Sequence, residues 1–178
     1  MLRATVCLIA LALSASALGA PHAPVPSWSG PTGSISSNVL ELALSAARCA
    51  EQAGVVNNPG TLTVIDYSKP STAKRMWVFD LKQRTLLYEE LVAHGRGSGD
   101  NIATSFSNKN GSHQTSLGLF VAAEPYVGQN GYSLRLDGLE RGVNNRARER
   151  GIVIHGAPYV SDDMARNMGR LGRSWGCP

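Results

Sequence analysis

The sequence predicts a mainly β domain with short helices. Its 178 residues include 19 Gly and 9 Pro, more than the average combined share of about 12%. From residue 61 onward apolar and polar residues alternate with a period of two, as in half-buried strands. The apolar fraction of 43% suits one globular core, and the charged fraction of 17% is low. These values exclude a coiled coil, a collagen-like rod and a charged disordered tail.

The first twenty residues have the pattern of a secretory signal. Arg3 precedes an apolar stretch over residues 4–13, and residues 15–17 form an Ala-Ser-Ala cleavage site. The stretch is shorter than the roughly 20 apolar residues that span a bilayer. We therefore predict a signal peptide over residues 1–20, export to the periplasm or cell envelope, and no membrane span after its removal. Residues 21–36, rich in Pro, Ser and Gly, are predicted to be a linker.

A helix is predicted over residues 38–53, at the start of a domain that covers residues 37–178. Asn38 and Glu41 have capping-box spacing, and Gly54 ends the run. Cys49 falls on the predicted apolar face, where a cysteine acts as a small buried hydrophobe. A disulfide between Cys49 and Cys177 is the other interpretation in an oxidising compartment.

The remaining elements follow from periodicity and turn residues. Strands are expected at residues 62–67, 75–80, 85–93, 117–122, 131–136 and 151–155. A long polar loop over residues 95–116 separates the third strand from the fourth. Short helices are expected around residues 146–149 and from Ser161, where two acids follow in the first turn.

The charge and the cofactor motifs exclude several classes of protein. A formal net charge of +4, with 13 Arg and 4 Lys, is too small for a nucleic-acid-binding protein. An arginine bias instead suits a small acidic substrate, because guanidinium binds carboxylates in a bidentate manner. The histidines and cysteines lack metal-ligand spacing, and the glycine-rich residues 95–99 lack phosphate-loop spacing. We expect neither a metal nor a cofactor.

The last quarter of the chain carries the candidate chemistry. A buried-type strand ends at His155 and Gly156, and Cys177 follows behind a glycine loop. A cysteine is nucleophilic as a thiolate, so a nearby histidine would serve as its base. The backbone N–H groups of Gly176 and Cys177 would form an oxyanion hole, and the Ser174 hydroxyl would bond near the thiolate. Residues 172–176 also match a G-x-S-x-G elbow, but that site needs a preceding strand and downstream acid and histidine residues.

These residues resemble a known family. His-Gly-Ala at residues 155–157, spaced ahead of Ser-Trp-Gly-Cys at residues 174–177, is similar to the signature of the murein L,D-transpeptidases of YkuD type. The branch with a Ser-Trp-Gly-Cys-Pro motif is the most similar. Further similar stretches occur in order at residues 93–99, 106–108, 116–118, 131–139 and 169–178. The resemblance extends from about Leu62 to Pro178.

The resemblance implies a fold, a reaction and roles for single residues. The fold would be an L,D-transpeptidase-like β-sandwich or barrel. Cys177 would be the acyl-accepting nucleophile, His155 its base, and the Gly156 carbonyl would orient the imidazole. The substrates would be peptidoglycan stem peptides, cut before a terminal D-Ala, with the acyl group passed to an amine or to water. Arg173 and the arginines at 146, 148 and 150 would be candidates to bind substrate carboxylates, and a solvated charged face is the other interpretation for any single one.

Two departures from the family pattern leave a second interpretation open. Trp175 stands where the wider family has a histidine, so we expect His94 to supply the second imidazole and to contact substrate. The pattern also continues past the cysteine with closing strands, whereas this sequence ends at Pro178, so we expect a domain incomplete at its C-terminus. The alternative is therefore a non-catalytic or truncated cell-wall-binding domain of the same fold.

Overall fold

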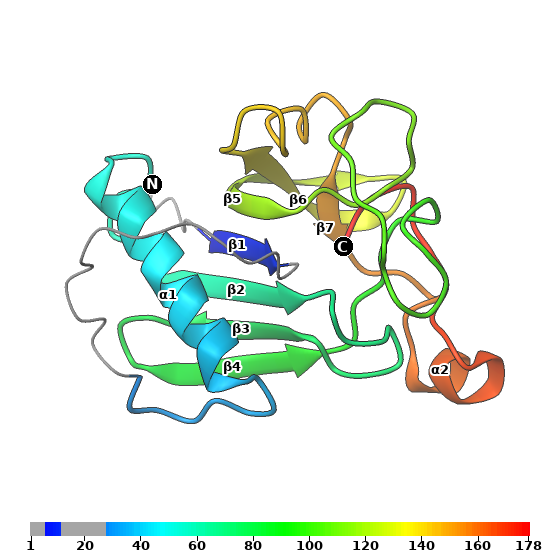
Figure 1. The fold of residues 1–178 in the computed structure, drawn as a ribbon, viewed down its shortest axis with the longest axis horizontal. Helices are drawn as coiled ribbons and strands as arrows, with labels where there is room; N and C mark the ends of the chain where they lie inside the picture. The colour runs from blue at the N-terminus through cyan, green and yellow to red at the C-terminus, as the bar shows by residue number, and fades with distance from the viewer. Residues whose placement is uncertain (1–5, 12–27) are drawn as a thin grey trace.

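The computed structural model describes residues 6–11 and 28–178 and shows a mainly β chain with two helices (Figure 1). Seven strands form one sheet in the order β4-β3-β2-β1-β5-β6-β7. The strands are β1 Val6–Leu11, β2 Thr61–Asp66, β3 Met76–Asp80, β4 Thr85–Glu90, β5 Gly118–Gly128, β6 Gly131–Gly138 and β7 Val153–His155. The helices are α1 Ser37–Gln52 and α2 Asp162–Met168. The predicted fold class is confirmed.

The strand β1 joins two antiparallel halves of the sheet. It pairs in parallel with β2 and antiparallel with β5. β2, β3 and β4 are antiparallel to one another, as are β5, β6 and β7. The segment 6–11 is also the apolar part of the predicted signal peptide. The predicted cleavage site at residues 15–17 and the linker up to residue 27 lie outside the described residues.

The helix α1 begins one residue earlier than predicted, and its N-cap lies two residues earlier. Ser36 is the N-cap, and its hydroxyl accepts a hydrogen bond from the backbone N–H of Val39. The expected cap at Asn38 is therefore wrong. The buried residues are Leu40, Ala43, Ala47 and Ala50. This face is rotated about the helix axis relative to the predicted apolar face that included Cys49. Cys49 is consequently exposed, not buried as expected.

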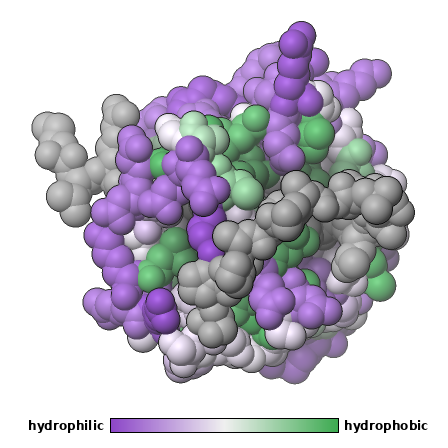
Figure 2. Space-filling model, turned by 60° about the vertical axis from the view of Figure 1, so that its left-hand side comes forward, coloured by the Kyte–Doolittle hydropathy of each residue, from purple (hydrophilic) through white to green (hydrophobic). Residues whose placement is uncertain are grey.

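Two apolar clusters lie against the sheet, because β2 alternates its side chains between the two faces. Leu62 and Val64 pack with Trp77, Phe79 and α1. Ile65 packs with the second cluster, whose other members come from β5, β6 and the segments that follow β2, β4 and β6. The surface on the α1 side is mostly hydrophilic, with apolar residues gathered in separate patches (Figure 2). The candidate site lies on the loops beyond the second cluster.

The sequence prediction is wrong for the segment before β7 and correct for the helix after it. Residues 141–151 form turns and not the expected short helix. The reason is the buried side chain of Asn144, whose amide donates to the carbonyls of Leu117 and Leu119 and fixes the turn. The prediction of α2 is confirmed: Ser161 caps it, and Gly169 ends it in the left-handed conformation.

Candidate active site

The C-terminal loop, residues 171–178, lies beside the long polar loop in Figure 1. A parallel bridge joins Gly95 to Ser174. The N–H of Ser174 donates to the carbonyl of His94 over 3.0 Å, and the N–H of Arg96 donates to the carbonyl of Ser174 over 2.8 Å. A Cβ at Gly95 would lie 2.9 Å from the Cα of Gly176, so the close approach requires glycine. These contacts fix the chain just before Cys177.

The turn at Gly176 presents the cysteine. Its φ of +126° is one that residues with a side chain rarely adopt. The N–H of Gly176 donates to the Ser174 hydroxyl over 3.1 Å, and that hydroxyl donates to the carbonyl of Cys177 over 2.6 Å. Ser174 thus shapes the loop through its backbone contacts. The Gly176 N–H, predicted for an oxyanion hole, is engaged by Ser174 in this structure.

The Cys177 thiol is half-buried and lies at the start of β7. Its sulfur donates to the carbonyl of Gly151 over 3.7 Å. Burial raises the pKa of the thiol, while the N–H of Val153 and the charge of Arg150 act to lower it. Burial dominates, so the resting side chain is a neutral thiol that needs a base to become nucleophilic. Cys49 and Cys177 are both free, so the disulfide interpretation is wrong for this structure.

His155 is the last residue of β7 and pairs in register with Ser133 on β6. Its Nδ1 lies 2.9 Å from the carbonyl oxygen of Gly156. A carbonyl accepts only, so Nδ1 carries the proton and Nε2 has a free lone pair. The imidazole and the thiol lie at opposite ends of the three-residue strand, and within the described chain no hydrogen bond joins them.

His94 is fully buried, in contrast to the expected contact with substrate. Arg75, also fully buried, donates to Nδ1 of His94 over 2.9 Å and to the carbonyls of Val92 and Lys69. Nε2 of His94 faces the carbonyl of Gly99 at 3.4 Å. Burial, and next the Arg75 charge, lowers the pKa of His94 to about 4. The neutral ring supports the backbone that holds Ser174 and offers no exposed atom to a ligand.

Arg173 and Trp175 flank the cysteine on the surface. The guanidinium of Arg173 donates to the carbonyl of Gly99 and forms an ion pair with Asp100 at 3.4 Å. The Trp175 side chain is 68% exposed, and its ring packs on the His113 ring with centroids 4.3 Å apart. His113 thus contacts Trp175, the residue that stands where a histidine was expected. The backbone of His113 has a positive φ of 54°, which is uncommon for a residue with a side chain. The sequence gives no indication of this conformation.

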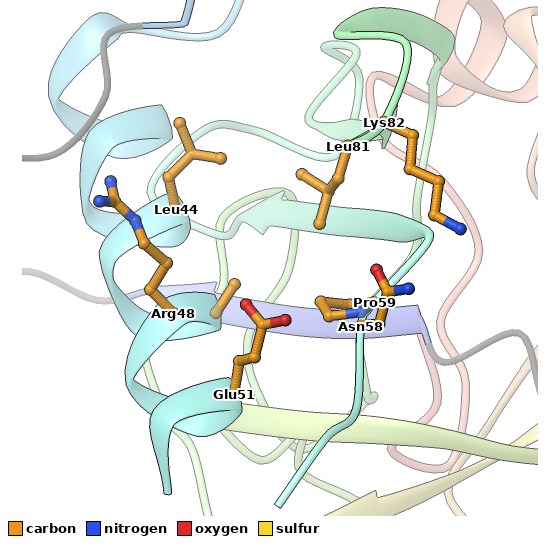
Figure 3. Close-up of a pocket in the computed structure, with 8 residues that line it drawn as sticks. Leu44, Arg48, Glu51, Asn58, Pro59, Leu81 and Lys82 are labelled. Carbon is orange, nitrogen blue, oxygen red and sulfur yellow. The ribbon is translucent and has the colours of Figure 1, made fainter. Parts of the chain in front are cut away.

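The pocket beside α1 is separate from these residues. Figure 3 shows it between the helix and the turns at Pro59 and Leu81, and its lining includes none of the predicted site residues. Within residues 6–11 and 28–178 there is no cluster of His, Cys, Asp and Glu that could hold a metal ion. No helix in this described part is long and apolar enough to cross a membrane.

Comparison with known proteins identifies the family. A family model described as the L,D-transpeptidase catalytic domain (YkuD_2) matches residues 32–178. Searches of curated proteins and of solved structures gave no match. The match covers more than half of the chain, including α1 and every residue of the candidate site. The chain therefore belongs to the L,D-transpeptidase catalytic domain family.

Proposed function

We propose that this chain is a cysteine acyltransferase that acts on peptidoglycan stem peptides, with Cys177 as nucleophile and His155 as general base. One observation carries the proposal: a half-buried thiol behind an obligatory glycine turn contacts Gly151, which leads into β7, and β7 ends at an imidazole whose Nε2 lone pair is free. A neutral thiol requires such a base. The hydrogen bond to the Gly156 carbonyl supports this role, because it fixes the tautomer that can accept a proton.

The reaction has two steps. In the first, His155 takes the thiol proton, the sulfur attacks the carbonyl that precedes the terminal D-Ala, and the C–N bond breaks. The imidazolium returns the proton to the departing amine, which leaves a thioester on Cys177. In the second step, an amine of another stem peptide attacks the thioester and the thiol is restored. If water attacks instead, the product is a shortened stem and the enzyme is an L,D-carboxypeptidase.

Substrate carboxylates and the exposed ring define the proposed binding surface. Arg173 is the predicted carboxylate partner, and its ion pair with the exposed Asp100 is one that a substrate carboxylate would replace. Trp175 presents an exposed aromatic surface next to the nucleophile. The N–H of Gly176 would reach an oxyanion only if Ser174 released it.

The alternative is a non-catalytic wall-binding domain of the same fold. Two observations favour it: His155 and Cys177 are not hydrogen-bonded to each other, and the Gly176 N–H is occupied. Catalytic contacts in unliganded enzymes are often long and shorten in the substrate complex. The enzyme would bring His155 and Cys177 into contact when substrate binds, whereas the wall-binding domain would not. Measurement of turnover therefore distinguishes the two functions.

We further propose that the protein is exported to the periplasm or cell envelope. The support is the signal pattern over residues 1–20, the Pro-rich linker over residues 21–36 and a substrate found in the cell wall. The catalytic domain would then be residues 37–178. Fractionation of cells that express the full chain, with N-terminal sequencing of the protein recovered outside the cytoplasm, tests the cleavage after the small residues.

Turnover of a defined muropeptide tests the reaction. A disaccharide-tetrapeptide is incubated with the full chain and with Cys177→Ala, and released D-Ala is measured by mass spectrometry. We expect release by the wild type and none by the variant. Binding of the muropeptide by both proteins, with no release by either, would support the wall-binding domain and contradict the acyltransferase.

A further inference from the structure

Arg150 lies immediately before the Gly151 carbonyl that the thiol contacts, and its guanidinium makes four hydrogen bonds. Nη1 donates to the Ser107 carbonyl over 2.6 Å and to the Ser116 hydroxyl over 2.5 Å. Nη2 donates to the Gln114 carbonyl over 2.6 Å and to the Ser112 hydroxyl over 3.3 Å. The side chain therefore ties the start of β7 to the polar loop that borders the nucleophile.

The charge of Arg150 has no anionic partner among the described residues. All four of its acceptors are neutral carbonyl or hydroxyl oxygens. The neighbouring arginines differ: Arg146 is paired with Glu149, and Arg148 with Asp137 and Glu124. A half-buried cation without a counter-charge is costly. Burial accordingly lowers the pKa of Arg150. Such a site favours a negative charge nearby.

The guanidinium also packs against the residue that precedes the nucleophile. A Cβ built on Gly176 would lie 3.3 Å from Nη2 of Arg150 and 3.0 Å from the Gln114 carbonyl oxygen. Because Gly176 has no side chain, nothing separates the guanidinium from the backbone of the cysteine loop. The thiol in turn contacts Gly151, the next residue after Arg150. The guanidinium thus lies against the residue before Cys177, the thiol contacts the residue after Arg150, and the Arg150 charge acts on the thiol.

The other groups that face the thiol do not supply a fixed positive charge. Burial raises the pKa of Tyr67 and of Tyr159, so both are neutral near pH 7. Arg146, whose charge acts to lower the pKa of Arg150, has a partly exposed side chain and is bound to Glu149. His155 lies at the far end of β7 with its Nδ1 on the Gly156 carbonyl. Among the described groups named here, Arg150 is the remaining cation, and its four hydrogen bonds hold it in place.

We propose that Arg150 is a positioning residue for Cys177: its unpaired guanidinium provides the counter-charge for the thiolate that forms when the nucleophile is activated. The neutral acceptors orient this charge without cancelling it. The proposal deepens the proposed function, since it specifies how a half-buried thiol becomes a thiolate. It concerns the thiol of the unliganded protein and can be measured without a substrate.

The rate of alkylation of Cys177 by iodoacetamide, followed over a range of pH, tests the proposal. The full chain carries Cys7→Ser and Cys49→Ser so that one thiol reacts. Arg150→Gln removes the charge, Arg150→Lys keeps it, and Arg146→Gln is the control on the same segment. We expect Arg150→Gln to raise the midpoint by about one pH unit and slow alkylation about tenfold near neutrality. Arg150→Lys should alkylate faster than Arg150→Gln, and Arg146→Gln should match the parent chain.

A second pair of variants keeps Arg150 and tests the same claim if Arg150→Gln does not fold. Ser112→Asp adds a carboxylate next to Nη2, and Ser112→Asn is its neutral match. The aspartate should raise the alkylation midpoint and the asparagine should not. Equal midpoints for these two, or for Arg150→Gln and the parent chain, would overturn the proposal. A shifted midpoint in a chain that shows no turnover would contradict the acyltransferase and support the role of Arg150.

Discussion

Ser174 and His94 are joined through their backbones, with the N–H of Ser174 donating to the His94 carbonyl over 3.0 Å. The His94 ring is in turn held by the buried guanidinium of Arg75 at 2.9 Å. A neutral imidazole and a buried guanidinium in the core thereby support the loop that ends in Cys177. Protonation of His94 would place two cations in contact, so this support depends on pH.

The first prediction concerns stability in acid. The pKa of His94 is about 4 when folded, against an ordinary 6.5. Between these values the unfolded chain binds a proton that the folded chain does not, so stability is complete above pH 6.5 and falls towards pH 4. The shift corresponds to about 3 kcal/mol. His94→Asn keeps an acceptor for Arg75 and cannot titrate. Urea unfolding at several pH values should show a smaller acid loss in this variant, and equal losses would contradict the account.

The second prediction compares two glycines of the site. Gly176→Ala must adopt a φ of +126° and meets Ile152 at 2.9 Å, so it should lose about 1–3 kcal/mol. Gly156→Ala meets no atom within 4 Å and keeps the carbonyl that accepts from His155. It should fold with nearly unchanged stability. Urea unfolding of both variants measures the difference. A stable Gly176→Ala chain with unchanged reactivity at Cys177 would show that this turn does not determine the position of the thiol.

The third prediction concerns the base. His155→Asn keeps a donor for the Gly156 carbonyl but has no lone pair in place of Nε2. Acylation of Cys177 by a muropeptide should slow by about 10²–10⁴, the usual contribution of a general base. Single-turnover kinetics gives the rate, and circular dichroism confirms the fold. An acylation rate equal to that of the wild type would exclude His155 as the base.

The fourth prediction concerns β1. This strand pairs with β2 on one side and with β5 on the other, so deletion of residues 1–20 leaves both as unpaired edges. The shortened chain should unfold at a lower temperature and with less cooperativity than the 178-residue chain. Thermal unfolding followed by circular dichroism measures both. Identical transitions would show that β1 contributes nothing to the sheet, and would make removal of a signal peptide harmless to the fold.

Local patterns predicted most of the sheet. The period of two located β2, β3 and β4, and the Ser161 cap located α2, because strand alternation and capping are local properties. The buried face of α1 is rotated about the helix axis relative to the predicted one, so the prediction that Cys49 is buried was wrong. The turn at residues 141–151 was missed because Asn144 bonds to carbonyls more than twenty residues distant.

The contacts around the nucleophile depend on loops that are far apart in the sequence. The pairs Arg75–His94 and His113–Trp175 join segments with no shared periodicity. No local pattern distinguishes a buried histidine from an exposed one in a glycine-rich loop. The sequence proposes which residues carry the chemistry. The packing of the loops determines that His94 is buried beneath the loop, whereas His155 ends β7.

The most direct test of the central claim is covalent capture of Cys177. Carbapenem-type β-lactams present a strained carbonyl that the proposed thiolate should attack to form a thioester. The full chain is incubated with a carbapenem, its intact mass is measured, and the modified residue is located by peptide mapping, with Cys177→Ser as control. The account predicts one adduct on Cys177 in the wild type and none in the variant. An unmodified wild-type chain, or an adduct on Cys49 alone, would contradict it.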